Sequence, residues 1–354
     1  RSQARSAGGG RPMTPSACEV RIPGAGDAAG VAFPGAREDL LARSPTRSVF
    51  QTLEWSQAWW EFFGRGLWLP VLASDAGGPV ALAPFYADCG MVYLVGSGGS
   101  DYLDVLGTPD AAALAAILDA ARARTPDFLG FVFYHVPEGS PTGALLARAA
   151  AEVGLVCVDQ GDLGAPAIDL AGQPGHAHEC TRKASLIRHE KGLRKAGEVE
   201  VSHVRTTAEI LPHLDGFFEQ HVARWANTAH PSLFNDPVQR RFYARLTELA
   251  GPAGWLRFTR VTWQGRPVAY HFGFCYRGSY LWYKPSFDVS LARYSPGEVL
   301  LRHLLLAAID EGAHTFDFGL GEEPFKARFA THVPRVRTWG LYPPSVLGPK
   351  GGSA

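Results

Sequence analysis

The chain has no excess of charge of either sign. Lys and Arg together number 34, and Asp and Glu together also number 34, so the formal net charge at pH 7 is zero. Proteins that hold nucleic acid through its phosphate backbone usually carry a positive excess. The balance argues against a generally basic DNA-binding protein, and we expect no DNA partner.

Cysteines are few and follow no spacing that is typical of a metal site or a disulfide frame. The five are scattered and odd in number, and no C-x-x-C pair occurs among them: Cys18, Cys89, Cys157, Cys180 and Cys275. Such usage fits reduced thiols inside a cell better than a secreted, cross-linked protein. We therefore expect free thiols, no bound metal and a cytoplasmic location.

Long apolar runs are also missing. No run approaches the roughly 20 residues that a helix needs to cross a bilayer. The first residues are rich in Arg, Ser and Gly and lack the apolar stretch of a secretory signal. We expect no membrane span, and we interpret residues 1–18 and 346–354 as flexible tails. Methionine is scarce as well. Because Met13 is the first of two, residues 1–12 are interpreted as an upstream remnant.

Two similar halves make up what is present. Apolar residues form 46% of the 354, enough for two domains with proper cores. Each half has an aromatic helix near its start, and then a hairpin whose second strand begins Pro-Val-Ala, at Pro79 and at Pro267. A loop, a helix, a strand and a helix follow in both. This pattern predicts a duplication into residues 19–165 and 166–345, each with a mixed α/β sheet. The bias towards Ala, Gly, Arg and Pro is typical of a GC-rich bacterial genome.

The best-defined local pattern lies after an aromatic strand in the second half. Ser295 is a good N-cap, Pro296 suits the first helical position, and Glu298 completes a capping box. Free N–H groups at such a helix start favour an anion, and Gly297 would let a ligand approach the backbone. An ordinary capped crossover explains the pattern equally well, and Glu298 would compete for the same N–H groups.

A basic helix is predicted over residues 181–197. Its cations are Arg182, Lys183, Arg188, Lys191, Arg194 and Lys195. Such a face is usually solvated, and the alternative is a surface for phosphate, CoA or tRNA.

Residues spread over about 48–342 resemble one known family in their order and spacing. They are Phe50-Gln51-Thr52, Trp55, Trp59, Asp101, Tyr102 and Asp104 in the first half; the basic helix; His221 and Trp225; Tyr283, Phe287 and Asp288; Tyr294 to Gly297; and Gly312, Phe316 to Phe318, Gly321, Glu323, Phe325 and Lys326. The chain resembles the GNAT superfamily, in particular the tandem-GNAT acyltransferases of the CelD/BioF-like type, relatives of the Fem aminoacyltransferases. The resemblance implies two GNAT-like domains, with the active site in the second.

The resemblance also implies a reaction. It is the transfer of an acyl group from acyl-CoA, a co-substrate and not a tightly bound cofactor, to an amine of a small molecule or an amino sugar. By position, the donor's pyrophosphate would lie at the helix start, on Tyr294, Ser295, Pro296, Gly297 and Val299. The usual glycine-rich pyrophosphate signature (Q/R-x-x-G-x-G/A) is absent there.

Candidate catalytic residues follow from the chemistry of acyl transfer. The attacking amine must lose a proton, the oxyanion must be stabilised and the leaving group must regain a proton. We assign the proton acceptor to Asp317 or His221 and the proton donor to Tyr283. The assigned substrate-binding residues are Trp225, His271, Asp288 and Lys326. Each has a plainer structural interpretation as a capping, core or solvated residue.

Two alternative functions stay open. One is a Fem-like aminoacyltransferase that uses aminoacyl-tRNA and forms a peptide bond; the basic helix favours it, and the zero net charge counts against it. The other is a catalytically silent binding module, since one half of a GNAT duplicate often loses activity. The sequence is compatible with a monomer or a homodimer.

Overall fold

The computed structural model describes residues 18–24 and 30–348. The predicted tail over 1–18 therefore lies outside the described part except for Cys18. The predicted tail over 346–354 lies outside it from residue 349 on, and residues 346 and 347 belong to the short helix α12 (Pro344–Leu347). Within the described ranges, no helix combines the length and the apolar character that crossing a membrane requires.

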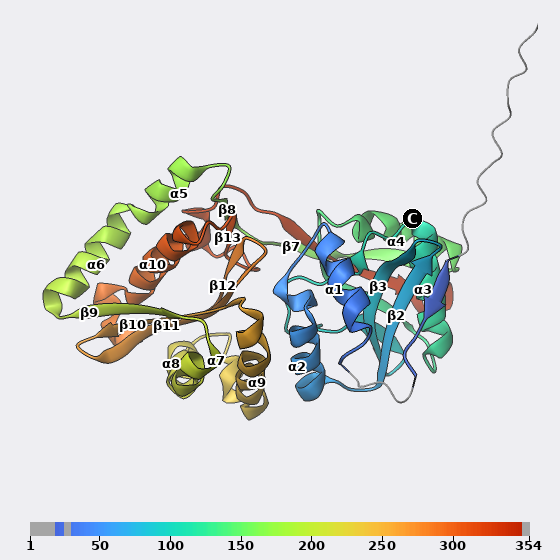
Figure 1. Cartoon of the computed structure of the whole chain (residues 1–354), viewed down its shortest axis with the longest axis horizontal. Helices are drawn as coiled ribbons and strands as arrows, with labels where there is room; N and C mark the ends of the chain where they lie inside the picture. Colours follow the sequence, from blue (N-terminus) through green and yellow to red (C-terminus); the bar gives the residue numbers. More distant parts are fainter. Residues whose placement is uncertain (1–17, 25–29, 349–354) are drawn as a thin grey trace, which may run out of the picture.

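Two mixed sheets form the two halves, which lie side by side (Figure 1). The first sheet has the order β1 (Glu19–Arg21), β2 (Leu67–Asp75), β3 (Gly78–Asp88), β4 (Met91–Leu94), β6 (Gly130–Pro137), β14 (Arg335–Tyr342) and β7 (Val156–Gly164), and β5 (Leu106–Gly107) pairs with β3. Its helices are α1 (Pro34–Arg43), α2 (Leu53–Phe63), α3 (Ala111–Arg124) and α4 (Pro141–Glu152).

The second sheet has the order β8 (Ala167–Asp169), β13 (Thr315–Asp317), β12 (Ser279–Phe287), β11 (Arg266–Tyr276), β10 (Leu256–Trp263) and β9 (Val199–Val204). Its helices are α5 (Pro174–Thr181), α6 (Ala184–Ala196), α7 (Thr207–Ile210), α8 (Leu214–Trp225), α9 (Pro237–Ala253), α10 (Pro296–Asp310) and α11 (Pro324–Ala327). The hairpin predicted at Pro267 is confirmed as β10 and β11, and β12 extends it to a three-stranded meander. The predicted basic helix over 181–197 is interrupted, because α5 ends at Thr181 and α6 begins at Ala184.

The last strand of the chain lies in the first sheet. β14 is antiparallel to both β6 and β7 and lies between them, although it belongs to the predicted second domain 166–345. If β14 were absent, the edges of β6 and β7 that face it would each present a row of unpaired backbone groups. The second half thus supplies an interior strand that the first half needs.

The apolar core is also shared. A single cluster of buried side chains runs from Trp55 and Phe85 in the first half to Phe242 and Phe274 in the second. Trp55 and Phe242 meet edge to face with ring centroids 5.5 Å apart, across the contact between α2 and α9. Aromatic pairs of this kind add about 0.5–1.5 kcal/mol to the burial of their area. The two halves therefore form one packed unit.

The helix predicted after Pro296 is confirmed, but its capping box is wrong. α10 begins at Pro296 and ends before Gly312, whose φ is +68°. Ser295 is left-handed, with φ 46°, and its hydroxyl donates to the Ala292 carbonyl instead of capping the helix. The Glu298 carboxylate contacts His189 at 2.7 Å and Arg328 at 3.2 Å. Tertiary contacts with His189 and Arg328 therefore take the carboxylate that the pattern assigned to the Ser295 N–H.

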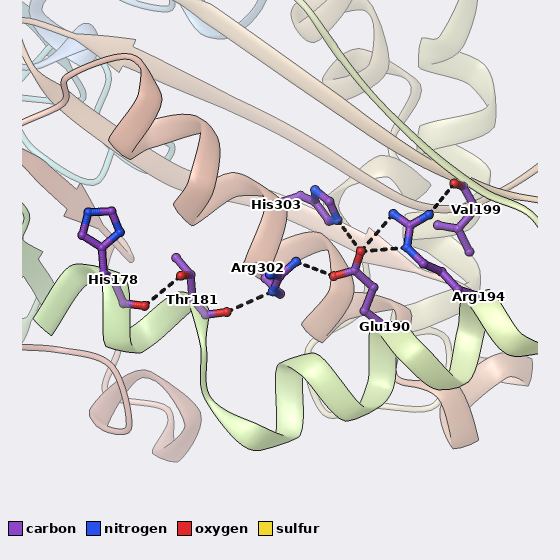
Figure 2. A network of polar contacts seen from close by, with 7 residues as sticks. All are labelled: His178, Thr181, Glu190, Arg194, Val199, Arg302 and His303. Carbon is purple, nitrogen blue, oxygen red and sulfur yellow. Dashed lines mark hydrogen bonds and ion pairs between the residues drawn. The ribbon is translucent and has the colours of Figure 1, made fainter. Parts of the chain in front are cut away.

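A buried carboxylate fastens α6 to α10 (Figure 2). Glu190, which is 8% exposed, accepts from Arg194 on α6 at 2.9 Å and from Arg302 and His303 on α10 at 2.5 and 3.1 Å. Burial raises the pKa of Glu190, but the charge and hydrogen bond of His303 and the two arginines outweigh it, so the pKa is lowered. With Glu190 turned inward, the outer face of α6 keeps its cations.

Candidate active site

β12 and β13 separate in the middle of the second sheet, and a cavity opens where they part. The two strands are parallel and paired over three residues, ending at Leu281 on β12 and Asp317 on β13. Beyond this point lies a cavity of about 320 Å³. Its walls come from the end of α8, from β12 at 282–285, from the segment 318–326, and from Asp101 of the first half. This volume suits a small ligand or the end of a longer one.

A bulge in β12 bends the strand at this cavity. Trp282 and Tyr283 together face Gly273 on β11, since Phe272 pairs with Lys284 and Phe274 with Leu281. The Tyr283 N–H, which the bulge removes from the ladder, donates instead to Nε2 of His271 at 3.2 Å. A bulge redirects side chains at a site, and here it turns β12 away from β13.

His271 is part of this support and not of the cavity wall. The ring is fully buried, and burial lowers its pKa to about 3, so it is neutral. Its Nε2 accepts from Tyr283 and therefore Nδ1 carries the proton, a buried donor that has no partner in the described structure. His271 does not line either cavity at the junction of the halves. The structure thus places this predicted substrate-binding residue inside the sheet.

A second cavity lies between the two halves and joins the first. It has about 420 Å³ and is walled by α2, by residues 97–99 of the first half and by α9 and β12 of the second. Leu233, Tyr283 and Lys284 line both cavities. The Tyr283 hydroxyl donates to the Gly99 carbonyl at 2.9 Å, which connects β12 to the loop at residues 97–99 of the first half. The two cavities therefore meet beside the bulge.

His221, a predicted proton acceptor, and Trp225, a predicted substrate-binding residue, lie together in the wall of the first cavity. Their rings are 6.0 Å apart, and His221 Nδ1 is 2.8 Å from the Ser232 hydroxyl. Burial, with the nearby charges of Lys284 and Arg224, lowers the pKa of His221 to about 3. The ring is therefore neutral at physiological pH and a weak base.

Asp317, the last residue of β13, does not lie in the wall of the first cavity. Its Oδ1 accepts from the Tyr102 hydroxyl of the first half and from the Gly319 N–H, each at 2.8 Å. Burial raises its pKa to about 6 against these two hydrogen bonds. It faces a pocket of about 70 Å³ at the junction and does not line the larger cavities. The hydrogen bond from Tyr102 thus connects Asp317 to the first half. A catalytic role for Asp317 stays a prediction.

Lys326 lines the first cavity but already has partners. Its ammonium donates to the carbonyls of Leu320 and Gly321 at 2.8 and 3.0 Å and pairs with Glu323 at 2.7 Å. The side chain is 4% exposed. Lys326 therefore shapes the segment opposite β12, and any ligand would have to share its donors.

The predicted pyrophosphate site at the start of α10 lies apart from both cavities. Tyr294, Ser295, Pro296, Gly297 and Val299 line neither of them. A Cβ at Gly297 would be 2.7 Å from the Phe287 ring, so this ring occupies the space that the sequence suggested for a ligand. Glu298 adds a carboxylate at the same helix start. A role of this helix start in holding the pyrophosphate of a donor stays a prediction.

Asp288 also has a structural position. It caps the short helix after β12 by accepting from the Ser290 N–H at 2.9 Å, and it pairs with Arg266 at 3.0 Å. It lines neither of the two joined cavities.

Sequence reasoning missed Lys284 and gave Asp101 no role. Both line the first cavity, and neither side chain has a hydrogen bond or ion pair with another described residue. The aromatic strand pattern could have located Lys284, since a cation directly after Trp282 and Tyr283 interrupts an apolar run. Asp101 comes from the other half, and no pattern along the chain reveals that approach.

Comparisons with known proteins agree with this architecture. Residues 181–327 match the model of the acetyltransferase (GNAT) domain. No curated protein matches the chain. Among solved structures, FemX superposes with a TM-score of 0.61 at 10% identity and covers 87% of this chain and 95% of its own.

Two further structures have the same arrangement. L-PGS from Bacillus licheniformis superposes with a TM-score of 0.53 at 14% identity, with 88% of this chain and 92% of its own covered. A tandem GNAT protein from the clavulanic acid biosynthesis pathway gives 0.50 at 12% identity, with 96% and 100% covered. At these identities the likeness shows the fold alone, which is that of two GNAT-like domains in tandem and confirms the predicted fold class.

Proposed function

We propose that this chain is an acyltransferase that moves an acyl group from acyl-CoA to an amine of a small molecule or amino sugar. The match of residues 181–327 to the GNAT acetyltransferase domain and the tandem GNAT-like fold support this proposal. The observation that carries the proposal is the cavity at the point where β12 and β13 part. The thioester end of the donor lies in this cavity, between 282–285 and 318–326. The acceptor amine arrives from the second cavity, which meets the first at Tyr283 and Lys284.

The reaction needs one bond formed and one broken. The acceptor nitrogen attacks the thioester carbonyl carbon, the C–S bond breaks, and CoA leaves as a thiolate that takes up a proton. The new ammonium loses one proton. Asp101 is the carboxylate in the cavity wall without a described partner, and we assign it as the proton acceptor, directly or through water.

Tyr283 contributes differently from the role that the sequence suggested. Burial raises its pKa well above the usual value for tyrosine, so the phenol stays protonated. A thiol has a pKa of about 8.5, so full proton transfer from Tyr283 to the departing thiolate is uphill. We assign Tyr283 to the junction wall, where its bond to Gly99 fixes the distance between donor and acceptor cavities.

A thermal-shift panel of the purified chain against CoA, acetyl-CoA, longer acyl-CoAs and an aminoacyl-tRNA pool tests the donor. A ligand at a hundred times its Kd stabilises a protein by about 2.7 kcal/mol. We expect CoA thioesters to raise the Tm, and Leu320→Trp, which fills the first cavity, to abolish the rise. Leu129→Trp is the control, because Leu129 is exposed and lies outside both cavities. A rise that Leu320→Trp leaves intact contradicts the placement.

A second candidate, transfer from aminoacyl-tRNA, is supported by the outer face of α6. Exposed cations on or next to this helix are Arg182, Arg188, Lys191, Arg194 and Lys195. The helix's own acidic residue, Glu190, is buried and pairs with Arg194, which leaves Arg188, Lys191 and Lys195 as the exposed cations of α6 without an ion pair to a described residue. Basic surfaces bind phosphate backbones with a strong dependence on salt. Stabilisation by aminoacyl-tRNA alone, lost at high salt and in Arg188→Ala/Lys191→Ala, would favour this candidate over acyl-CoA.

A further inference from the structure

Lys284 occupies the meeting point of the two cavities. It follows the bulge in β12 and lines both the cavity at the parting strands and the one between the halves. Its ammonium lies over the Tyr283 ring, 4.1 Å from the centroid. The side chain is partly exposed, and neither a hydrogen bond nor an ion pair joins it to another described residue. A cation at this junction therefore points into space that a ligand can enter.

The surroundings of Lys284 make a ligand anion favourable. A desolvated ammonium costs free energy unless an anion or hydrogen-bond acceptors compensate it. Burial lowers the pKa of Lys284, and the Asp101 carboxylate raises it from beyond ion-pair distance. The other cation of the second cavity, Arg65, pairs with Asp88 at 2.8 Å and is mostly exposed. Lys284 is thus the cation at the junction that lacks a close counter-charge.

The second cavity also has the walls that an apolar ligand needs. Rings of Trp59, Phe63, Tyr86 and Phe242 line it, and its volume of about 420 Å³ falls within the range of small-molecule sites. Such rings bind the body of a ligand without specifying its charge. The aromatic walls and the single open cation together describe a molecule with an apolar part and an anionic end.

We propose that Lys284 binds an anionic group of the acceptor, and that the acceptor is a small amine carrying a carboxylate or a phosphate beside an apolar or aromatic body. The role of this ligand as acceptor rests on the proposed acyltransferase function, whereas anion binding at Lys284 does not. The apolar body lies among the rings between the halves. The anion sits at Lys284, which leaves the amine beside the parting strands.

Two probes of equal shape test this inference without any donor. Binding of 3-phenylpropionate and of its uncharged amide is measured by thermal shift and by quenching of tryptophan fluorescence, and phenyl phosphate is added to distinguish phosphate from carboxylate. We expect at least one of the two anions to bind the unaltered chain about tenfold or more tightly than the amide, or about 1.4 kcal/mol. Lys284→Met should remove the preference, and Lys284→Arg should keep it.

Arg124→Met, which removes an exposed cation from the last turn of α3, is the control and should retain the preference. Equal binding of the anions and the amide by the unaltered chain overturns the inference, as does a preference that survives in Lys284→Met. Failure of all three probes to bind up to their solubility limits also overturns it. The comparison on the unaltered chain stands even if Lys284→Met does not fold. If no CoA thioester raises the Tm in the thermal-shift panel, the proposed donor is refuted. The comparison of anion and amide binding is unaffected by that outcome.

Discussion

At the scale of single residues, Asp317 shows how one carboxyl group can hold two halves together at a cost that depends on pH. It accepts hydrogen bonds from Tyr102 of the first half and from the Gly319 N–H, yet burial raises its pKa to about 6. Because the pKa of Asp317 is higher in the folded state than the ordinary 3.8, protonation of this carboxyl group stabilises the folded state. This contribution is complete below about pH 4 and is lost as the pH rises through about 6.

Asp317→Asn should therefore change how stability depends on pH. The amide oxygen can still accept both hydrogen bonds, and it carries no charge to desolvate. The free energy of unfolding of the variant, relative to the unaltered chain, should rise by about 2–3 kcal/mol between pH 4 and pH 8. Chemical denaturation across that window measures it. Asp39→Asn, at an exposed position on α1, should show no such rise. A difference that stays constant with pH would refute this account of Asp317.

The sequence predicted residue types better than residue surroundings. His221, Trp225, Tyr283 and Lys326 do reach one cavity. His271 could not be assigned, because alternation along a strand gives two faces and the bulge at Gly273 changes which groups need a partner. Asp101 belongs to the first half, whereas the other residues that line the first cavity belong to the second. Spacing along the chain carries no information about such an approach.

At the scale of elements, the bulge in β12 determines where the strands part. Gly273 lies opposite the extra residue, and a Cβ there would run into the His271 ring and lie 2.5 Å from the Leu281 carbonyl oxygen. A side chain at this position must displace β12 or the imidazole that accepts from Tyr283. The glycine is therefore required by space, since its φ is not among the positive ones.

Gly273→Ala should destabilise the chain by about 2 kcal/mol or more, the range of overpacking in a core. It should also weaken stabilisation by the donor, because the shift occurs at the cavity. Gly175→Ala in α5 is the control; its Cβ would meet open space, and stability should be unchanged or slightly higher. Chemical denaturation with and without CoA measures both effects. An alanine tolerated at position 273 would show that the bulge is not held by this packing.

Element types followed from the sequence where periodicity was strong. The hairpin at Pro267 and α10 are confirmed, since the turn at Gln264-Gly265 and the glycine stop at Gly312 are local features. The capping box failed because Glu298 found His189 and Arg328, which tertiary contacts bring to it. A prediction from local sequence fails where a residue distant in the sequence binds the same side chain more strongly.

At the scale of the whole molecule, the two halves share a core and a strand. The cluster around Trp55 and Phe242 crosses the junction, and β14 returns from the second half to lie between β6 and β7. The duplication in sequence predicted two similar units, but the return of β14 could not be predicted. An isolated strand pattern does not say which sheet it enters.

A chain that ends at Pro334 should lose cooperative unfolding, because β6 would gain an unpaired edge and β7 would lose the one strand that it pairs with in the described sheet. A chain that ends at Pro343 keeps β14 and loses α12 of the described elements, and it should unfold in a single transition. Circular dichroism during heating distinguishes the two. A single transition of unchanged midpoint in the shorter chain would mean that β14 is dispensable.

The placement of the donor between the parting strands is tested most directly by hydrogen–deuterium exchange with and without saturating CoA. The amides of 282–287 and 318–326 wall the cavity or continue its strand. We predict slower exchange in both segments when CoA is bound, and little change in the first sheet away from the junction. Unchanged exchange in both segments at saturating CoA would contradict the account.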